Sequence, residues 1–74
     1  MRSIVKTLDA QGMIDRLESR GWYFVRQCGT SHRIYKNNNS PGVLITVPYH
    51  KGKDLPPGTQ RAIMRDAGIK PNEL

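Results

Sequence analysis

Two turn signals in the middle of the chain constrain its fold more than any other feature. The first, residues 29–31 (GTS), separates the aromatic and β-branched run 22–27 from the alternating run 32–36. The second, residues 37–42 (NNNSPG), separates that run from the apolar run 43–47. Because such short connections join antiparallel neighbours, the sequence predicts a three-stranded antiparallel meander.

A helical pattern precedes the predicted sheet, and another follows it. Asp9 suits the N-cap of a helix over residues 10–20, and Gly21 follows the last turn. A second helix over residues 57–67 begins with a proline, which suits a first turn, and Gly68 ends it. The apolar stripe of the first helix consists of Met13, Ile14 and Leu17.

Two amphipathic helices need one apolar surface to cover, so we expect both on the same face of the sheet. The expected fold class is α+β, a two-layer α-β-β-β-α sandwich. The 74 residues fit one domain, 1–74, in which the patterned region spans about 10–69. We expect residues 1–8 and 70–74 to be loose ends, with pairing or packing of Ile4, Val5 and Leu8 as the alternative. The single cysteine, Cys28, excludes an internal disulfide, offers no metal-ligand spacing and is interpreted as a filler.

The aromatic residues of the predicted strands could stack on bases. They are Trp22, Tyr23, Phe24 and Tyr35. A small sheet needs aromatic side chains for its core, so packing is the expected role of Trp22 and Phe24.

The charge balance indicates a polyanionic partner. Twelve Lys and Arg against six Asp and Glu give a net charge of +6, a strong positive field for so short a chain. Nucleic acid or an acidic protein would suit it, although such a charge also occurs on domains that are simply well solvated. No apolar run approaches the ~20 residues of a membrane helix, and the start lacks the apolar core of a signal peptide. We therefore expect a cytoplasmic protein with no membrane contact.

His32 is the leading candidate for chemistry. It stands at the start of a predicted strand, directly after a turn of small residues and among cations. An imidazole can take a proton from a ribose 2′-hydroxyl or give one to a leaving 5′-oxygen, and neighbouring cations can bind the phosphates. The alternative is a structural histidine that is hydrogen-bonded to the backbone and chemically idle.

The other candidate residues support this interpretation by charge or by position. Those predicted to contact RNA phosphates are Arg26, Arg33, Lys36, Lys51, Lys53, Arg61 and Arg65. Those predicted as auxiliary groups are Ser31, Tyr35 and His50. The last four cations can equally form an ordinary solvated surface, and His50 can be a plain loop residue. Two histidines without a partnering cysteine make a poor metal site, so we expect no metal and no small-molecule cofactor.

Four blocks of sequence resemble the HicA (YcfA-like) toxin family, the small mRNA interferases of bacterial toxin–antitoxin pairs. Together they cover residues 10–69, most of the chain. The last block is the most specific, because Asp-Leu-Pro-x-Gly-Thr followed by a helix ending in Ala-Gly is an unusual arrangement. The blocks are residues 13–22 (MIDRLESRGW), 25–36 (VRQCGTSHRIYK), 45–50 (ITVPYH) and 53–69 (KDLPPGTQRAIMRDAGI).

This resemblance implies a fold like that of a double-stranded-RNA-binding domain and a metal-independent endoribonuclease. It also implies an RNA substrate, mRNA, and a cognate HicB-like antitoxin protein. The family's catalytic histidine follows a Gly/Ser turn, and the match of Gly29, Ser31 and Lys36 assigns that role to His32. Family members commonly have Gly-Ser-His-His here, whereas this chain has Thr30 inserted and Arg33 in place of the second histidine, which removes one helper group.

Two other functions compete with the toxin hypothesis. One is a non-catalytic double-stranded-RNA-binding module. It would share the fold, but its function needs no histidine at the start of a strand. The other is a DNA-binding or purely protein-binding domain that uses the basic surface. Cleavage of single-stranded RNA in EDTA would separate an enzyme from these binding proteins.

Overall fold

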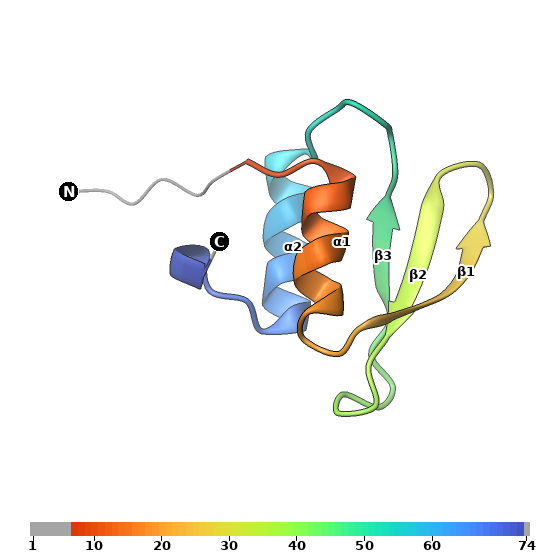
Figure 1. The fold of residues 1–74 in the computed structure, drawn as a ribbon, viewed down its shortest axis with the longest axis vertical. Helices are drawn as coiled ribbons and strands as arrows, with labels where there is room; N and C mark the ends of the chain where they lie inside the picture. The colour runs from red at the N-terminus through yellow and green to blue at the C-terminus, as the bar shows by residue number, and fades with distance from the viewer. Residues whose placement is uncertain (1–6, 74) are drawn as a thin grey trace.

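The computed structural model describes residues 7–73 and confirms the predicted α-β-β-β-α order (Figure 1). A single turn of 3₁₀ helix follows the second α-helix. The elements are α1 (Ala10–Glu18), β1 (Tyr23–Cys28), β2 (His32–Lys36), β3 (Ile45–Pro48), α2 (Pro57–Ala67) and the 3₁₀ turn (Pro71–Glu73). Within this described part of the chain, no helix is long and apolar enough to cross a membrane.

The three strands form one antiparallel sheet in the order β1-β2-β3, with both helices on the same face (Figure 1). The helices pack against β3, so β1 forms the sheet edge farthest from them. The pairing of β1 with β2 shifts by one residue between Phe24 and Arg26, which indicates a β-bulge there. The predicted meander and the predicted placement of the helices are therefore confirmed.

The ends of three predicted elements differ from the observed ones. α1 stops at Glu18 instead of residue 20, because the chain turns through Gly21, whose φ of +93° favours glycine. β1 begins one residue later than predicted, because Trp22 leaves the sheet and is buried in the core. β3 begins at Ile45 instead of residue 43, because the amide of Val43 still bonds to the preceding turn.

The ends of α2 agree with the prediction. The helix spans Pro57–Ala67, and Gly68 ends it in the left-handed conformation with φ of +74°. The predicted N-cap of α1 is also confirmed, because the Asp9 carboxylate accepts a hydrogen bond of 2.7 Å from the amide of Gly12. Caps and a helix-starting proline act locally, which explains why the sequence predicted them well.

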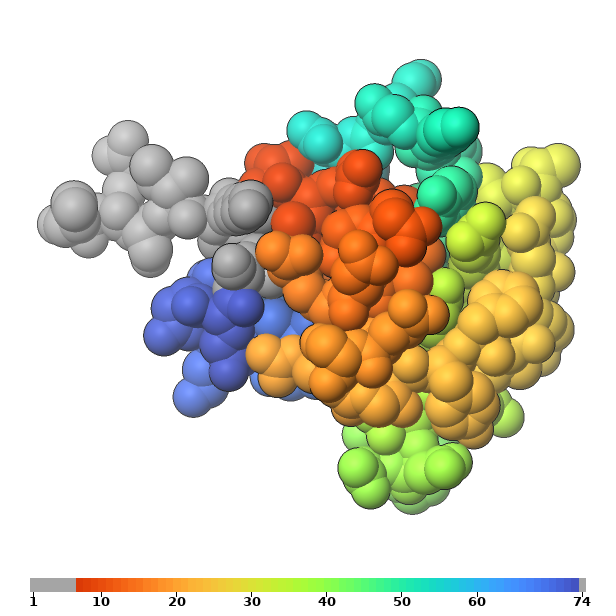
Figure 2. Space-filling view, viewed as in Figure 1, coloured from red at the N-terminus to blue at the C-terminus, as the bar shows by residue number. Residues whose placement is uncertain are grey.

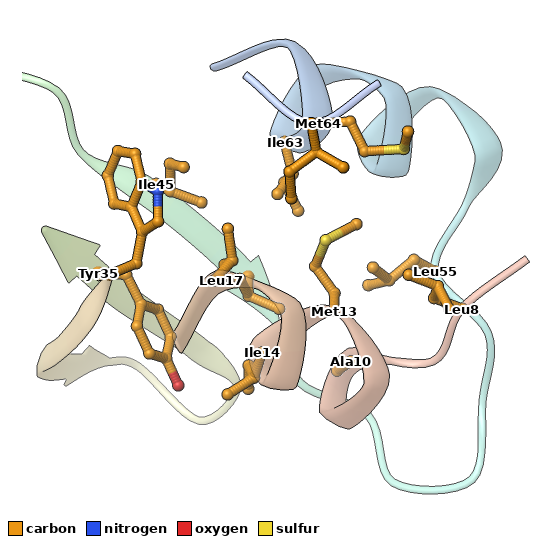
Figure 3. Close-up of a cluster of buried hydrophobic side chains, with 13 residues drawn as sticks. Leu8, Ala10, Met13, Ile14, Leu17, Tyr35, Ile45, Leu55, Ile63 and Met64 are labelled. Carbon is orange, nitrogen blue, oxygen red and sulfur yellow. The ribbon is translucent and has the colours of Figure 1, made fainter. Parts of the chain in front are cut away.

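The core lies between the helices and the sheet (Figure 3). β2 and β3 contribute Tyr35, Ile45 and Val47, all buried. Figure 3 shows Tyr35 pointing toward α1, beside Ile14. The core residues from the rest of the chain are Leu8, Ala10, Met13, Ile14, Leu17, Trp22, Leu55, Ile63, Met64 and Ile69.

Residues at both ends of the described chain contact the rest of the fold. Leu8 is buried; its amide donates to the side-chain oxygen of Gln60 at 2.9 Å, and its carbonyl accepts from the amide of Leu55 at 2.8 Å. At the other end, the carboxylate of Glu73 lies 3.4 Å from the guanidinium of Arg20. Leu8 thus packs into the core, as the alternative for this residue had it, while residues 1–6 and 74 lie outside the described residues.

Candidate active site

The sheet face turned away from the helices carries His32, and we call it the open face. Directly opposed residues in an antiparallel sheet point to the same side, so the register defines rows across the three strands. His32 lies between Cys28 and Pro48 in the first row, and Ile34 lies between Arg26 and Thr46 in the second. In the third row Lys36 lies opposite Tyr23, and alternation from Ile45 places Leu44 on its other side.

The backbone just before His32 is held by hydrogen bonds. In the β1–β2 turn, Gly29 has a φ of +63°, and the side-chain amide of Gln27 donates to the carbonyl of Thr30 at 3.2 Å. The carbonyl of Ser31 accepts from the amide of Tyr49 at 2.6 Å, which ties the turn to the chain leaving β3. The His32 side chain is exposed and has no hydrogen-bond partner among residues 7–73. Its position is thus fixed while its ring remains accessible.

The open face also lacks negative charge in the described part of the chain. Residues 19–53, which include all three strands, contain no Asp or Glu but six Lys and Arg. The acidic residues lie on the helices and their flanking segments, at Asp9, Asp15, Glu18, Asp54, Asp66 and Glu73. The composition gave only the net charge, whereas this gap between Glu18 and Asp54 would have indicated which surface is positive. Phosphates can therefore approach His32 without meeting a carboxylate on the same face.

Arg33 and Tyr35 lie on the other side of the sheet from His32. The guanidinium carbon of Arg33 is 3.9 Å from the ring centroid of Tyr49, whose hydroxyl donates to the side-chain oxygen of Gln11 at 3.1 Å. Tyr35 is buried, and burial raises the pKa of its phenol, while the hydrogen bond from Arg33 partly lowers it. The structure therefore separates both residues from His32, with which the sequence had grouped them.

The predicted loop residues lie at the same end of the sheet as His32. His50, Lys51 and Lys53 follow β3, whose last residue, Pro48, is paired with His32. Figure 1 shows this connection and the β1–β2 turn at the same end of the molecule. All three side chains are exposed, and His50 and Lys51 line a hollow beside the start of α1. Lys51 and Lys53 can thus contact a chain of phosphates that passes over His32.

Arg61 and Arg65 lie on a different surface. Both are exposed on α2, whereas Gln60, Ile63 and Met64 of the same helix are buried. Because α2 packs on the covered face of the sheet, its exposed side points away from the open face. The structure does not bring these two arginines, both predicted to contact RNA, together with His32.

Sequence reasoning misplaced two further side chains. Phe24 was expected in the core but is 50 % exposed, with its edge against Tyr35 at a centroid distance of 5.9 Å. Cys28 was interpreted as a filler but lies exposed and directly across the hairpin from His32. The predicted burial of Trp22 is confirmed. Strand periodicity alone could not show that the helices leave β1 uncovered.

The arrangement around His32 suits acid/base chemistry. Within residues 7–73, no three His, Cys, Asp or Glu side chains gather as ligands for a metal ion. One exposed imidazole with cations on the same face can move a proton and bind a phosphate.

Comparison with known proteins agrees with the sequence resemblance. A family model described as the HicA toxin of bacterial toxin–antitoxin matches residues 10–69, more than half of the chain. A search of curated proteins returned no match.

Proposed function

The chain belongs to the HicA toxin family of bacterial toxin–antitoxin systems, and on this premise we propose that it is an endoribonuclease that cleaves mRNA through His32. The observation that carries the proposal is the exposed imidazole on a sheet face without carboxylates. His32 lies next to the β1–β2 turn, which a hydrogen bond to Tyr49 holds in place, and a single strand of RNA can reach it there.

In the proposed reaction, a 2′-hydroxyl attacks the adjacent phosphorus and the bond from phosphorus to the 5′-oxygen breaks. His32 either accepts the proton of the 2′-hydroxyl or donates a proton to the leaving 5′-oxygen. Water or a weaker group takes the other role, so we expect a slow enzyme. No step requires a metal ion.

Positive charge on the open face supports the reaction. Arg26 lies in the row next to His32, and Lys36 lies on the same face at the far end of β2. Lys51 and Lys53 extend the positive surface at the His32 end. Cations so placed would bind phosphates and stabilise the charge that develops during cleavage. We leave Arg61 and Arg65 out of the proposed RNA contacts because they point elsewhere.

The departure from the family pattern at position 33 does not weaken this proposal. Residue 33 faces the helices, where Arg33 lies against Tyr49. A histidine there would also lie on the other side of the sheet from His32. The loss of the family's second histidine therefore leaves the chemistry of the open face unchanged.

The test is cleavage of single-stranded RNA in EDTA by the wild type and by two single variants. We expect His32→Ala to lose cleavage while its circular dichroism and melting stay close to those of the wild type, because the ring is exposed. His50→Ala should retain most activity and serves as the matched control. Cleavage by folded His32→Ala would refute the catalytic assignment, and RNA binding without any cleavage by the wild type would favour a non-catalytic RNA-binding module.

A further inference from the structure

A pocket opens at the end of the open face farthest from His32. It has a volume of about 430 Å³ and lies where β1, β2 and the 37–44 loop meet. Figure 2 shows this loop projecting from the molecule at the end opposite the 49–56 loop. The pocket falls within the usual size range of small-ligand sites, about 300–1,000 Å³.

Apolar side chains form two of its walls. Tyr23 is 45 % exposed and Leu44 is 49 % exposed, and both line the pocket. They are two of the three large hydrophobic residues left exposed in the described chain, the third being Phe24. The Tyr23 ring can stack on a flat ligand ring, and the Leu44 side chain, two strands away, can contact the same ligand from the other wall.

Polar groups around these walls match the rest of a nucleotide. Lys36 lies opposite Tyr23 in the sheet and lines the same pocket, where it can meet a phosphate. The Tyr23 hydroxyl donates to the side-chain oxygen of Asn38 at 3.3 Å, while the amide nitrogen of Asn38 has no protein partner among residues 7–73. This nitrogen and the Ser40 hydroxyl, which also lines the pocket, can bond to a base edge.

The pocket wall is held in place before any ligand binds. The side-chain nitrogen of Asn37 donates to the carbonyl of Arg20 at 3.0 Å, and its side-chain oxygen accepts from the amide of Asn39 at 2.9 Å. The amide of Ser40 donates to the carbonyl of Asn37 at 3.0 Å. The loop therefore needs little reorganisation on binding.

The pocket and His32 are connected by β2. Lys36 lies four residues after His32, which corresponds to about 13 Å along a strand. A stacked nucleotide rises about 3.4 Å, so this distance spans at most about four nucleotides.

We propose that this pocket binds one nucleobase of the RNA substrate, stacked on Tyr23, within about four nucleotides of the scissile phosphate. The inference rests on the proposed ribonuclease function and adds a base-binding subsite to it. Contacts from Asn38 and Ser40 would give this position a base preference, whereas the phosphate contacts near His32 would not.

The test measures binding in the His32→Ala background, so that cleavage does not interfere. A labelled single-stranded RNA is compared with an abasic RNA that has the same phosphates, by fluorescence anisotropy. Tyr23→Leu should weaken binding of the intact RNA about tenfold, since stacking of one base commonly contributes this much. It should leave binding of the abasic RNA unchanged, and Tyr23→Phe should restore the binding of intact RNA.

Phe24 provides a matched control, because it is adjacent, aromatic and equally exposed but lies on the other face. Phe24→Leu should bind both RNAs as the parent does. The inference is overturned if Tyr23→Leu weakens both RNAs equally or neither, or if it weakens only binding of a protein antitoxin. A wild type that binds but does not cleave RNA would refute the proposed function while leaving this binding test readable.

Discussion

At the scale of single residues, neighbours on one strand serve different structures. His32 is exposed on the open face, whereas Arg33 is half-buried on the other side against Tyr49. Their adjacency in sequence made both look like parts of one basic site. Alternation along β2 separates them, so substitutions at the two positions should have different consequences.

Arg33→Ala should reduce stability without weakening RNA binding. Loss of the contact with Tyr49 and of the bond to Tyr35 should lower the free energy of unfolding by about 1 kcal/mol. Arg26→Ala, which removes an equal charge from the open face, should show the reverse pattern. Urea titration and anisotropy measure the two effects, and weaker RNA binding by Arg33→Ala alone would contradict the assignment.

Tyr35 should make stability sensitive to alkaline pH. Burial raises the pKa of this phenol in the folded state above that in the unfolded chain. The resulting stabilisation is complete below the unfolded pKa of about 10 and is lost as the pH rises through the folded value. We expect Tyr35→Phe to reduce the fall in unfolding free energy above about pH 10. An unchanged slope in the variant would show that other groups cause the fall.

At the scale of elements, the segment before α1 acts as part of the core. Leu8 lies beside Leu55 in Figure 3, and Asp9 forms an isolated bridge with Asp54. The segment therefore connects α1 with the loop that leads into α2. Its contribution depends on contacts between residues far apart in sequence.

Leu8→Ala should destabilise the fold strongly. Removing a buried leucine side chain commonly costs about 2–5 kcal/mol, a large share of the stability of a chain this short. Thr7→Ala, at the exposed neighbouring position, is the control and should change little. Urea unfolding curves of the two variants provide the measurement, and equal midpoints would show that the segment is not part of the core.

The same contrast explains which elements the sequence could predict. α2 and the turns depend on Pro57, Gly68 and Gly29, whose effects are local, and these predictions agree with the structure. The burial of Leu8 and the exposure of Phe24 depend on how far the helices extend over the sheet. No local pattern contains that information.

The candidate site was predictable to a similar degree. The Gly/Ser turn predicted His32 at the start of β2, and the structure places it there. Strand alternation and the position of α2 place the predicted cations on different surfaces, which a list of residues does not show. Tyr23 was among the aromatic residues that could stack on bases, but its pocket was not predicted because it needs the 37–44 loop folded against β1.

At the scale of the whole molecule, the position of a charge should matter more than its number. Lys36→Glu and Arg61→Glu change the net charge equally, but Lys36 lies on the open face and Arg61 on the outer side of α2. We expect Lys36→Glu to weaken RNA binding markedly and to reduce its dependence on salt, while Arg61→Glu has a small effect. Equal losses in a salt titration would indicate that only the overall charge matters.

The cognate antitoxin should cover the open face with acidic side chains. An inhibitor placed there would block RNA and His32 together. Antitoxin binding should survive His32→Ala, which removes little contact area, and should weaken in Lys36→Glu. RNA and antitoxin should exclude each other in a competition assay at moderate salt, and a stable ternary complex would place the inhibitor elsewhere.

The separation of charges along the chain also makes one side of the folded molecule more positive than the other. Residues 19–53 carry six cations and no carboxylate, whereas residues 7–18 and 54–73 together carry four cations and six carboxylates. Arg20 pairs with Glu73 and Arg33 faces the helices, so the open face and the adjoining residues 51–53 keep four of these cations and no carboxylate. We therefore expect this side to be the positive end of the folded molecule. The electric field of a polyanion such as RNA should rotate this molecule as it approaches. Most encounters should then begin with the sheet facing the polyanion. Productive orientation would then be set during diffusion, and the fraction of successful collisions would fall as salt shortens the range of the field.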